Sequence, residues 1–558
     1  MPTTLLDNAG ALERRFGTRL PESGPGSARV RQTLSPVEPL VELDAGNGAW
    51  RRLVSARDPQ AEAERWADET VLAGAPATVI LIGSGLGYVL DAIERRQLPT
   101  RAVVVEPDTA LARLLLERRD WRTWIEGGRL ALLVGPDYDG VPAVARLMDG
   151  VDSAPLYLHP ALARLWPGPS REAVTAVERL RFEAASNQHA RRTLAGRYLR
   201  HTLANAPRLT REGDGSALEG LMAGVPAVIV AAGPSLDRNI HDLHLVRDRA
   251  LIVACDTAAR PLLSLGVEPQ LVLAIDPSVA NACHLGALHE PRRTWLAAEC
   301  SLHPPAFAHF EGRTFFFRIG NHAPWPWLRE AGFDRLQLNV WGSVVTAALD
   351  LVLRMGCDPI VFAGTDLAFT DHRPYARGTT LEAQWASWVA GGETYERVFG
   401  LVMDRWPTVT AADLSGESTR TASHLVAFRD WMAARARQAA PVRIVNATGA
   451  GILHGSAIEI ATAAETLAAY PPLDLDEVQA RIAAAHRPSP NPSALFECIH
   501  ALEQGGWALP ESWATTDPAA TPAALRQALE GPEYAAWRLG RTIAASPRRR
   551  ELSLHPIV

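Results

Sequence analysis

The stretch VPAVIVAAGPSLD, residues 225–237, decides the fold. Residues 227–231 form a short, largely β-branched apolar run, which predicts a buried parallel strand. The run ends at Gly233-Pro234-Ser235, where the chain must turn before a helix. Such a turn exposes backbone N–H groups with the positive end of the helix dipole behind them, which suits a phosphate or a carboxylate. The stretch therefore predicts an anion-binding turn, with an ordinary strand-to-helix turn as the alternative.

Three further apolar runs end in carboxylates, and each run predicts another buried strand. Ligands of open α/β sheets bind beyond the carboxyl ends of the strands, so we expect the turn and these carboxylates to converge on one crevice. The sequence thus predicts an α/β nucleotide-binding domain. The runs are residues 251–255, 271–275 and 359–363, and the carboxylates are Asp256, Asp276 and Asp366.

The composition excludes several kinds of site. All 56 basic residues are arginine, so a Walker-type phosphate loop and pyridoxal-phosphate or Schiff-base chemistry, which need a lysine, are excluded. Any cationic contact to a phosphate must come from arginine, histidine or a metal. The formal charge of −6 argues against nucleic acid as the main partner. A sugar nucleotide, which needs only a local positive site, remains allowed.

The cysteines and the apolar runs indicate the compartment. The five cysteines are scattered and contain no Cys-x-x-Cys motif, so they predict neither a disulfide framework nor a zinc site. No apolar run has the length of a signal-peptide core or reaches the roughly 18 residues that span a bilayer. We expect a cytoplasmic protein without membrane insertion, and the sequence sets no oligomeric state.

A second glycine-rich turn lies nearer the N-terminus. The apolar run 78–82 precedes Gly83, Gly85 and Gly87, and the next apolar run ends at Glu106. This layout holds a ribose beside a pyrophosphate or an adenosyl group in Rossmann-like domains. Similar turns are also kept for packing. These four residues are candidates for an accessory site, and packing is the alternative.

The pattern along the chain predicts three domains. A polar, glycine-containing segment at 211–216 favours a boundary after a pair of arginine-rich amphipathic helices. We expect a Rossmann-like domain with its connecting helices in residues 1–205, the central α/β domain in 206–460, and a helical domain in 461–558.

Five runs in order resemble the motility-associated factor (Maf) flagellin glycosyltransferases: AAGPSLDRNI, ACDTAARPLLSLGVEP, LAIDP, WGSVVTAALDLVLRMGCDPIVFAGTDLAF and VNATGAGILHG. The central domain of that family is similar to 6-hydroxymethylpterin pyrophosphokinases of the MptE type. Its Gly-Pro-Ser-Leu turn resembles that of bacterial sialyltransferases that use CMP-sugars. The resemblance implies transfer of a nonulosonic acid, of the pseudaminic or legionaminic type, from a CMP donor to Ser or Thr of flagellin.

The chemistry of that transfer suggests roles for the first two strand ends. The leaving CMP phosphate must be stabilised, which backbone donors of the turn Gly233-Pro234-Ser235-Leu236 can do. Asp256 suits the ribose or base of the nucleotide, because a carboxylate accepts hydrogen bonds from hydroxyl and amino groups.

The remaining candidates have alternatives of their own. Asp276 and Asp366 could hold Mg²⁺, the one cofactor suggested, or one could be a general base, or either could cap a helix. His372 matches a histidine of the family's Asp-Leu-Ala motif and could accept the acceptor's proton, although a loop histidine is often only a surface residue. Gly342 and Ser343 open a helix whose N–H groups offer a second set of donors, with loop closure as the alternative.

Three other functions stay open. A diphosphokinase that passes pyrophosphate from ATP to a pterin alcohol needs the same turn and carboxylates. A methyltransferase that uses S-adenosylmethionine would be centred on residues 83–106 instead. A non-catalytic flagellar chaperone would use none of these residues chemically.

Overall fold

The computed structural model describes residues 3–18, 20, 29–34, 39–45, 48–55, 57–136, 138, 140–286, 288, 293–320, 322, 324–488, 493, 495, 497 and 499. The chain forms two compact units, residues 1–189 and 190–558. Each unit contains a parallel sheet with helices, which confirms the predicted α/β class. The three predicted domains stay predictions, and the part of the third beyond residue 499 lies outside the described residues.

The first unit contains a four-stranded parallel sheet in the order β6-β5-β4-β7. In chain order this is 3-2-1-4, which is how the doubly wound order of nucleotide-binding sheets begins. β4 reads TVILI and is buried along its whole length, because apolar β-branched residues suit a strand that is covered on both faces. The strands are β4 (Thr78–Ile82), β5 (Arg101–Glu106), β6 (Leu130–Val134) and β7 (Leu156–Leu158).

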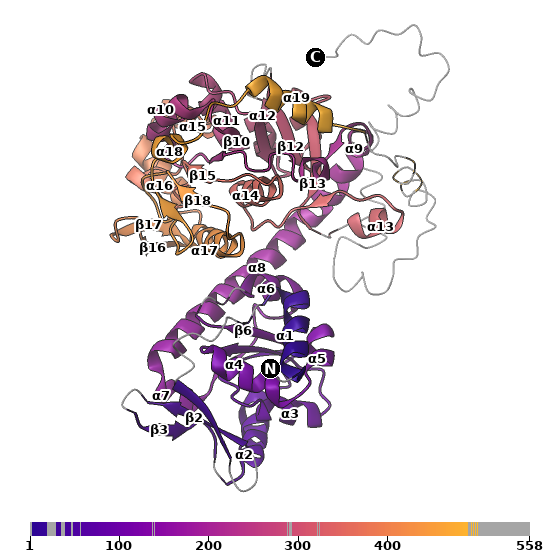
Figure 1. Ribbon diagram of the computed structural model, residues 1–558, viewed down its shortest axis with the longest axis vertical. Coiled ribbons are helices and arrows are strands. Elements are labelled where there is room, and N and C mark those ends of the chain that lie inside the picture. The colour runs from indigo at the N-terminus through magenta and orange to yellow at the C-terminus, as the bar shows by residue number, and fades with distance from the viewer. Residues whose placement is uncertain are drawn as a thin grey trace. The chain divides into compact units, whose positions relative to one another are not determined.

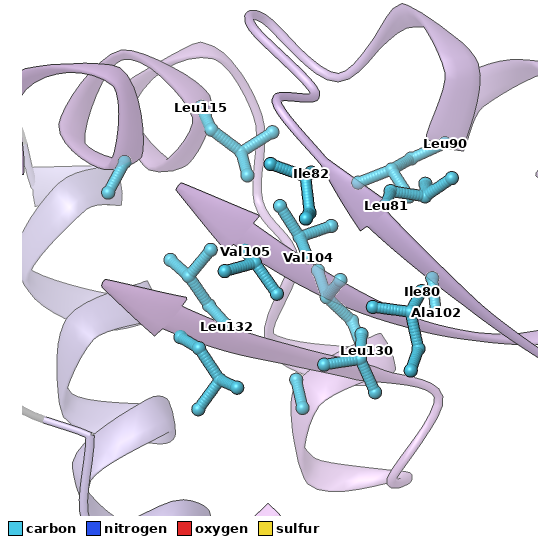
Figure 2. Packing of buried hydrophobic residues seen from close by; sticks show 14 of the residues in the cluster. Ile80, Leu81, Ile82, Leu90, Ala102, Val104, Val105, Leu115, Leu130 and Leu132 are labelled. Carbon is cyan, nitrogen blue, oxygen red and sulfur yellow. The ribbon is translucent and has the colours of Figure 1, made fainter. Parts of the chain in front are cut away.

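The core of this sheet is shown in Figure 2. Side chains of neighbouring strands, among them Leu81 and Val104, pack against one another. Leu90 from α3 (Tyr88–Arg95) and Leu115 from α4 (Thr109–Arg118) reach the strands from the covering helices. The first unit thus has a hydrophobic core of its own.

Further elements complete the first unit. A small antiparallel sheet has the order β1-β2-β3. Its strands are β1 (Val30–Leu34), β2 (Pro39–Asp44) and β3 (Trp50–Arg52). The remaining helices are α1 (Thr3–Phe16), α2 (Pro59–Trp66), the π-helical turn η2 (Ala67–Val71), α5 (Arg122–Glu126), α6 (Val141–Leu147) and α7 (Pro160–Leu165), and α8 (Pro167–Ala204) continues from this unit into the second.

The second unit contains a ten-stranded sheet in which every pairing is parallel. The order is β14-β13-β12-β11-β10-β9-β15-β18-β19, and β8 also pairs with β13. The strands are β8 (Gly213–Asp214), β9 (Ala227–Val230), β10 (Leu251–Cys255), β11 (Leu271–Ala274), β12 (Trp295–Glu299), β13 (Thr314–Arg318), β14 (Leu336–Gln337), β15 (Ile360–Ala363), β18 (Ile444–Asn446) and β19 (Glu459–Ile460).

Helices cover both faces of this sheet (Figure 1). Successive residues of a strand point to opposite faces. Val228 therefore belongs to a core cluster with residues of α10, α11, α12 and α18, whereas Ile229 belongs to a second cluster with residues of α14, α17 and α19. The covering helices are α10 (Leu236–Val246), α11 (Asp256–Ser264), α12 (Val279–Gly286), α18 (Ala463–Leu467), α14 (Val344–Arg354), α17 (Ser423–Gln438) and α19 (Leu475–Ala485). The first residues of the predicted helical C-terminal domain therefore pack on the central sheet.

The order of the strands locates a topological switch point. From β9 the chain runs through β10 to β14 on one side, and it then returns through α14 to β15 on the other side of β9. Ligands of open α/β sheets bind where the order reverses in this way. The ends of β9 and β15 are therefore the places at which a functional site is expected.

The connection from β15 to β18 is long and structured. It contains a 3-10 turn, two helices, an antiparallel hairpin and α17. These elements are η5 (Thr370–His372), α15 (Thr380–Ala390), α16 (Tyr395–Met403), β16 (Thr408–Ala412) and β17 (Ser418–Ala422). The other short helices of the unit are α9 (Ala206–Arg211), η3 (Gly215–Leu218), η4 (Pro304–Phe307) and α13 (Trp325–Glu330).

No helix in the described part of the chain is both long enough and apolar enough to cross a bilayer.

Candidate functional site

Ser235 and Asp366 meet at the switch point. Ser235 follows β9, and Asp366 follows β15, 131 residues later. The Ser235 hydroxyl donates to Asp366 Oδ1 at 2.6 Å, and the Ser235 backbone N–H lies 3.3 Å from both carboxylate oxygens. Asp366 is 1% exposed. Burial raises the pKa of Asp366, whereas the hydrogen bonds from Ser235 and Thr370 and the charge of Arg238 lower it.

Gly233 is needed for this contact. A Cβ on Gly233 would lie 2.1 Å from Asp366 Oδ2 and 2.6 Å from the carbonyl oxygen of Gly364. The Gly233 N–H donates to that same carbonyl at 2.8 Å, and the Leu236 N–H donates back to Gly233 at 3.0 Å. Pro234 has no N–H to offer. The backbone donors that the sequence predicts for a phosphate are therefore engaged within the protein.

Asn239, which the sequence analysis does not select, joins α10 to the ends of two strands, β15 and β18. It lies on the buried face of α10 and is 7% exposed. Its Oδ1 accepts the N–H of Gly364 at 2.9 Å, and its Nδ2 donates to the carbonyls of Ala447 at 3.3 Å and Thr448 at 3.1 Å. An amide within the apolar face of an amphipathic helix is the sequence signal for such a residue, because a buried amide needs hydrogen-bond partners.

Asp256 is the first residue of α11, directly after β10. Its Oδ1 accepts from the N–H of Thr257 at 2.7 Å and from the Thr257 hydroxyl at 3.1 Å, and the residue is 2% exposed. Burial raises the pKa of Asp256 to about 7, the bonds from Thr257 and the Asn281 amide oppose this, and the charge of Asp276 adds to it. Near neutral pH this carboxyl group can therefore both accept and donate hydrogen bonds.

The two candidate ligands for Mg²⁺ do not fit one shared site. Asp276 is exposed beyond β11 and its Oδ1 accepts the N–H of Ser278 at 2.8 Å, whereas Asp366 is buried against Ser235. β11 and β15 are separated by β10 and β9, so three strand spacings, about 14 Å, lie between them. In the part of the chain that the structure describes, no group of three His, Cys, Asp or Glu side chains could hold a metal ion.

His372 lies in the exposed loop that follows Asp366. Both Asp371 and His372 adopt left-handed backbone conformations, with φ of 54° and 55°, which non-glycine residues rarely do. The His372 N–H donates to the carbonyl of Phe369 at 3.1 Å. The loop is thus held in a strained conformation close to the switch point, as is often seen at functional sites.

Arginines tie this loop to the start of α10, and the sequence analysis did not assign them. Arg238 contacts Asp371 at 3.1 Å, and Arg373 contacts Asp237 at 2.5 Å. Arg377 donates its backbone N–H to Asp237 at 2.8 Å. The sequence signal for these residues was the absence of lysine from the chain, because arginine is then the side chain that can supply a permanent positive charge near the turn.

Gly342 and Ser343 precede α14. Gly342 has φ of 64°, and a Cβ there would lie 3.1 Å from the ring of Phe428. The Ser343 carbonyl accepts the Thr346 hydroxyl at 2.6 Å, and the Ser343 side chain makes no capping bond to the helix. Because α14 connects two parallel strands, its N-terminus lies on the edge of the sheet formed by the carboxyl ends. The pair is thus at the same edge as Ser235, on the opposite face from α10.

The glycine-rich turn of the first unit is filled by apolar side chains. Gly83, Gly85 and Gly87 have φ of 81°, 58° and 79°. A Cβ would lie 2.6 Å from Leu162 at the first of these and 2.5 Å from Leu115 at the third. The packing alternative is favoured by these contacts.

Two buried glutamates are the last residues of their strands and accept hydrogen bonds from serines. Glu106 at the end of β5 accepts the N–H of Ser84 at 2.7 Å and its hydroxyl at 2.8 Å. Glu299 at the end of β12, which the sequence analysis missed, accepts the N–H of Ser301 at 2.6 Å and also its hydroxyl. Both are 0% exposed, and burial raises the pKa of each to about 7 against the effect of the serine bonds.

A surface cavity of about 330 Å³ lies in the first unit and includes none of the predicted site residues. Its charged groups pair with one another, for example Arg14 with Glu126 at 3.2 Å and Arg122 with Asp120 at 2.6 Å. The lining residues are Leu6, Asp7, Arg14, Asp120, Arg122, Thr123 and Glu126.

Part of the chain matches a known family and two curated relatives. Residues 200–372 match the family described as 6-hydroxymethylpterin diphosphokinase MptE-like. Two uncharacterized proteins of Treponema pallidum (strain Nichols) are 32% identical over 158 residues and 28% identical over 168 residues. The matches span 28% and 30% of this chain, but only 27% and 57% of those relatives.

The fold has a solved counterpart. The structure of a Maf glycosyltransferase from Magnetospirillum magneticum AMB-1 is similar with a TM-score of 0.51, at 16% identity, over 96% of this chain and 89% of that one. The similarity extends over both units, whereas the five sequence motifs all lie in the second. The chain therefore contains an MptE-like region at residues 200–372 and has the fold of a Maf glycosyltransferase along nearly its whole length.

Proposed function

We propose that the protein is a cytoplasmic glycosyltransferase that moves a nonulosonic acid, of the pseudaminic or legionaminic type, from its CMP donor to Ser or Thr of flagellin. The observation that carries the proposal is the convergence of Ser235 and Asp366 at the switch point of an MptE-like domain. The whole-length similarity of fold to a Maf glycosyltransferase supports it. The donor and the acceptor follow from the resemblance of the sequence motifs.

The proposed reaction breaks the bond between the anomeric carbon of the sugar and the phosphate oxygen of CMP. The acceptor hydroxyl forms the new bond to that carbon and gives its proton to His372, and CMP leaves with the electron pair. Asp256 accepts a hydrogen bond from a hydroxyl group of the ribose or an amino group of the base of the donor. Asp366 positions Ser235, because its buried carboxylate holds both the hydroxyl and the N–H of that residue.

Calorimetry with CMP, ATP and S-adenosylmethionine tests the proposed nucleotide. We expect CMP to bind, and Gly233→Asp to abolish binding because its new carboxylate would collide with Asp366. Asp256→Asn, which keeps the shape of the side chain, should weaken CMP binding by roughly tenfold through loss of a charged hydrogen bond. Circular dichroism of both variants separates loss of binding from loss of folding.

Each other result of the calorimetry points to a named rival. Binding of ATP without CMP would replace the proposal with the pterin diphosphokinase. Binding of S-adenosylmethionine that survives Gly233→Asp would move the chemistry to the first unit.

His372→Ala tests the proposed base. We expect kcat to fall by roughly 10²–10⁴-fold, the usual contribution of a general base, while the affinity for CMP stays unchanged. His309→Ala, at another exposed position, is the matched control and should leave the rate as it was. A wild-type rate in the His372 variant would make this histidine an ordinary surface residue.

A further inference from the structure

We propose that Arg238 binds the phosphate of the nucleotide donor and that the phosphate replaces Asp371 as the partner of its guanidinium group. This inference rests on the proposed function and assigns the phosphate contact to a side chain outside the glycine turn. Two features of the switch point support it: the backbone donors of the turn are already engaged, and the side chain of Arg238 is exposed.

The turn at the start of α10 already holds an anion. The carboxylate of Asp366 accepts the N–H and the hydroxyl of Ser235, and it lies against Gly233 without space for a methyl group. The N–H groups of Gly233 and Leu236 donate to backbone carbonyls. A phosphate placed here would meet a buried negative charge with no free donors, so it must sit farther out.

Arg238 is positioned for that outer place. It lies in the first turn of α10, and its Nη2 donates to the Ser235 hydroxyl at 3.2 Å. Its Nη1 donates to Asp371 Oδ2 at 3.1 Å. The two paired side chains are 56% and 60% exposed. Exposed pairs of this kind contribute little stability, whereas a guanidinium group binds phosphate through two parallel charge-assisted hydrogen bonds. Exchange of Asp371 for a phosphate is therefore favoured.

The neighbouring arginines are less suited to exchange. Arg373 is 17% exposed and its partner Asp237 is 25% exposed, so this shorter pair anchors the loop to α10. Arg377 is 78% exposed but approaches Asp237 only to 3.7 Å. When the donor phosphate displaces the Asp371 carboxylate from Arg238, the loop loses this tie to α10. Because Asp371 directly precedes His372, the change would reach the proposed base.

Calorimetry with CMP, cytidine and inorganic phosphate tests the assignment in Arg238→Gln and Asp371→Asn. We expect Arg238→Gln to weaken CMP and phosphate binding by roughly tenfold or more and to leave cytidine binding unchanged. Asp371→Asn removes the competing carboxylate and should tighten CMP binding by about two- to fivefold. Arg443→Gln removes another exposed, ion-paired arginine, which precedes β18 and pairs with Glu459 of β19, and should change nothing.

The opposite results would overturn the inference in distinguishable ways. If CMP binds the wild type and Arg238→Gln equally well, the phosphate contact lies elsewhere while the proposed function stands. If Arg238→Gln weakens cytidine as much as CMP, the arginine binds the nucleoside instead. If Asp371→Asn weakens CMP binding, Asp371 assists the ligand and does not compete with it. Failure of the wild type to bind CMP at all would overturn both proposals.

Discussion

Gly451→Ala is expected to lower the free energy of unfolding by about 2–5 kcal/mol and to disrupt the switch point. Gly451 has φ of 81°, which costs a residue with a side chain about 1–2 kcal/mol. The added Cβ would also lie 2.0 Å from the carbonyl oxygen of Asp366 and 2.5 Å from its Cα. Overpacking typically costs about 1–3 kcal/mol more. The backbone of Asp366 would have to move, and with it the hydrogen bonds to Ser235.

Gly449→Ala provides the matched control in the same loop. Gly449 has a similar φ of 72°, but an added Cβ would meet nothing within 4 Å. Only the backbone cost of about 1–2 kcal/mol is expected there. Urea titrations followed by tryptophan fluorescence measure both variants. Equal destabilisation of the two would show that the approach to Asp366 is not tight.

Glu299→Gln is expected to change how stability depends on pH. Glu299 is fully buried at the end of β12, and this burial raises its pKa from 4.5 to about 7, against the hydrogen bonds from Ser301. The folded state thus disfavours the charged form. The contribution of Glu299 to the free energy of unfolding is therefore fully present below about pH 4.5. It is lost as the pH rises through 7, and the loss reaches about 3 kcal/mol at pH 8. Glutamine has no charge to bury and should remove this loss.

The comparison that checks this prediction is made at pH 5 and pH 8. Relative to the wild type, Glu299→Gln should gain about 2–3 kcal/mol in free energy of unfolding between the two conditions, because the wild type has lost little of this stability at pH 5. Glu330→Gln, on the exposed side of α13, is the control. An identical difference at both pH values would mean that Glu299 is not proton-linked to folding in this range.

Much of the local structure could be predicted from the sequence. Short β-branched runs form β9, β10 and β15, because such side chains suit strands covered on both faces. The positions of Asp256 and Asp366 after their strands, and the turn at Gly233, follow from the same local patterns. These features depend on residues near one another in the chain, so the sequence alone was sufficient to predict them, together with the resemblance to Maf proteins.

The neighbours of these residues were decided only by the tertiary structure. The contact of Ser235 with Asp366 depends on β9 lying beside β15, and the distance of Asp276 from Asp366 depends on two intervening strands. Asn239 and Arg238 acquire their partners from loops more than 100 residues away. Strand order and loop packing are long-range properties set by burial of the whole sheet. The sequence by itself therefore determined the elements and the candidate carboxylates, and the tertiary structure decided which of them lie together.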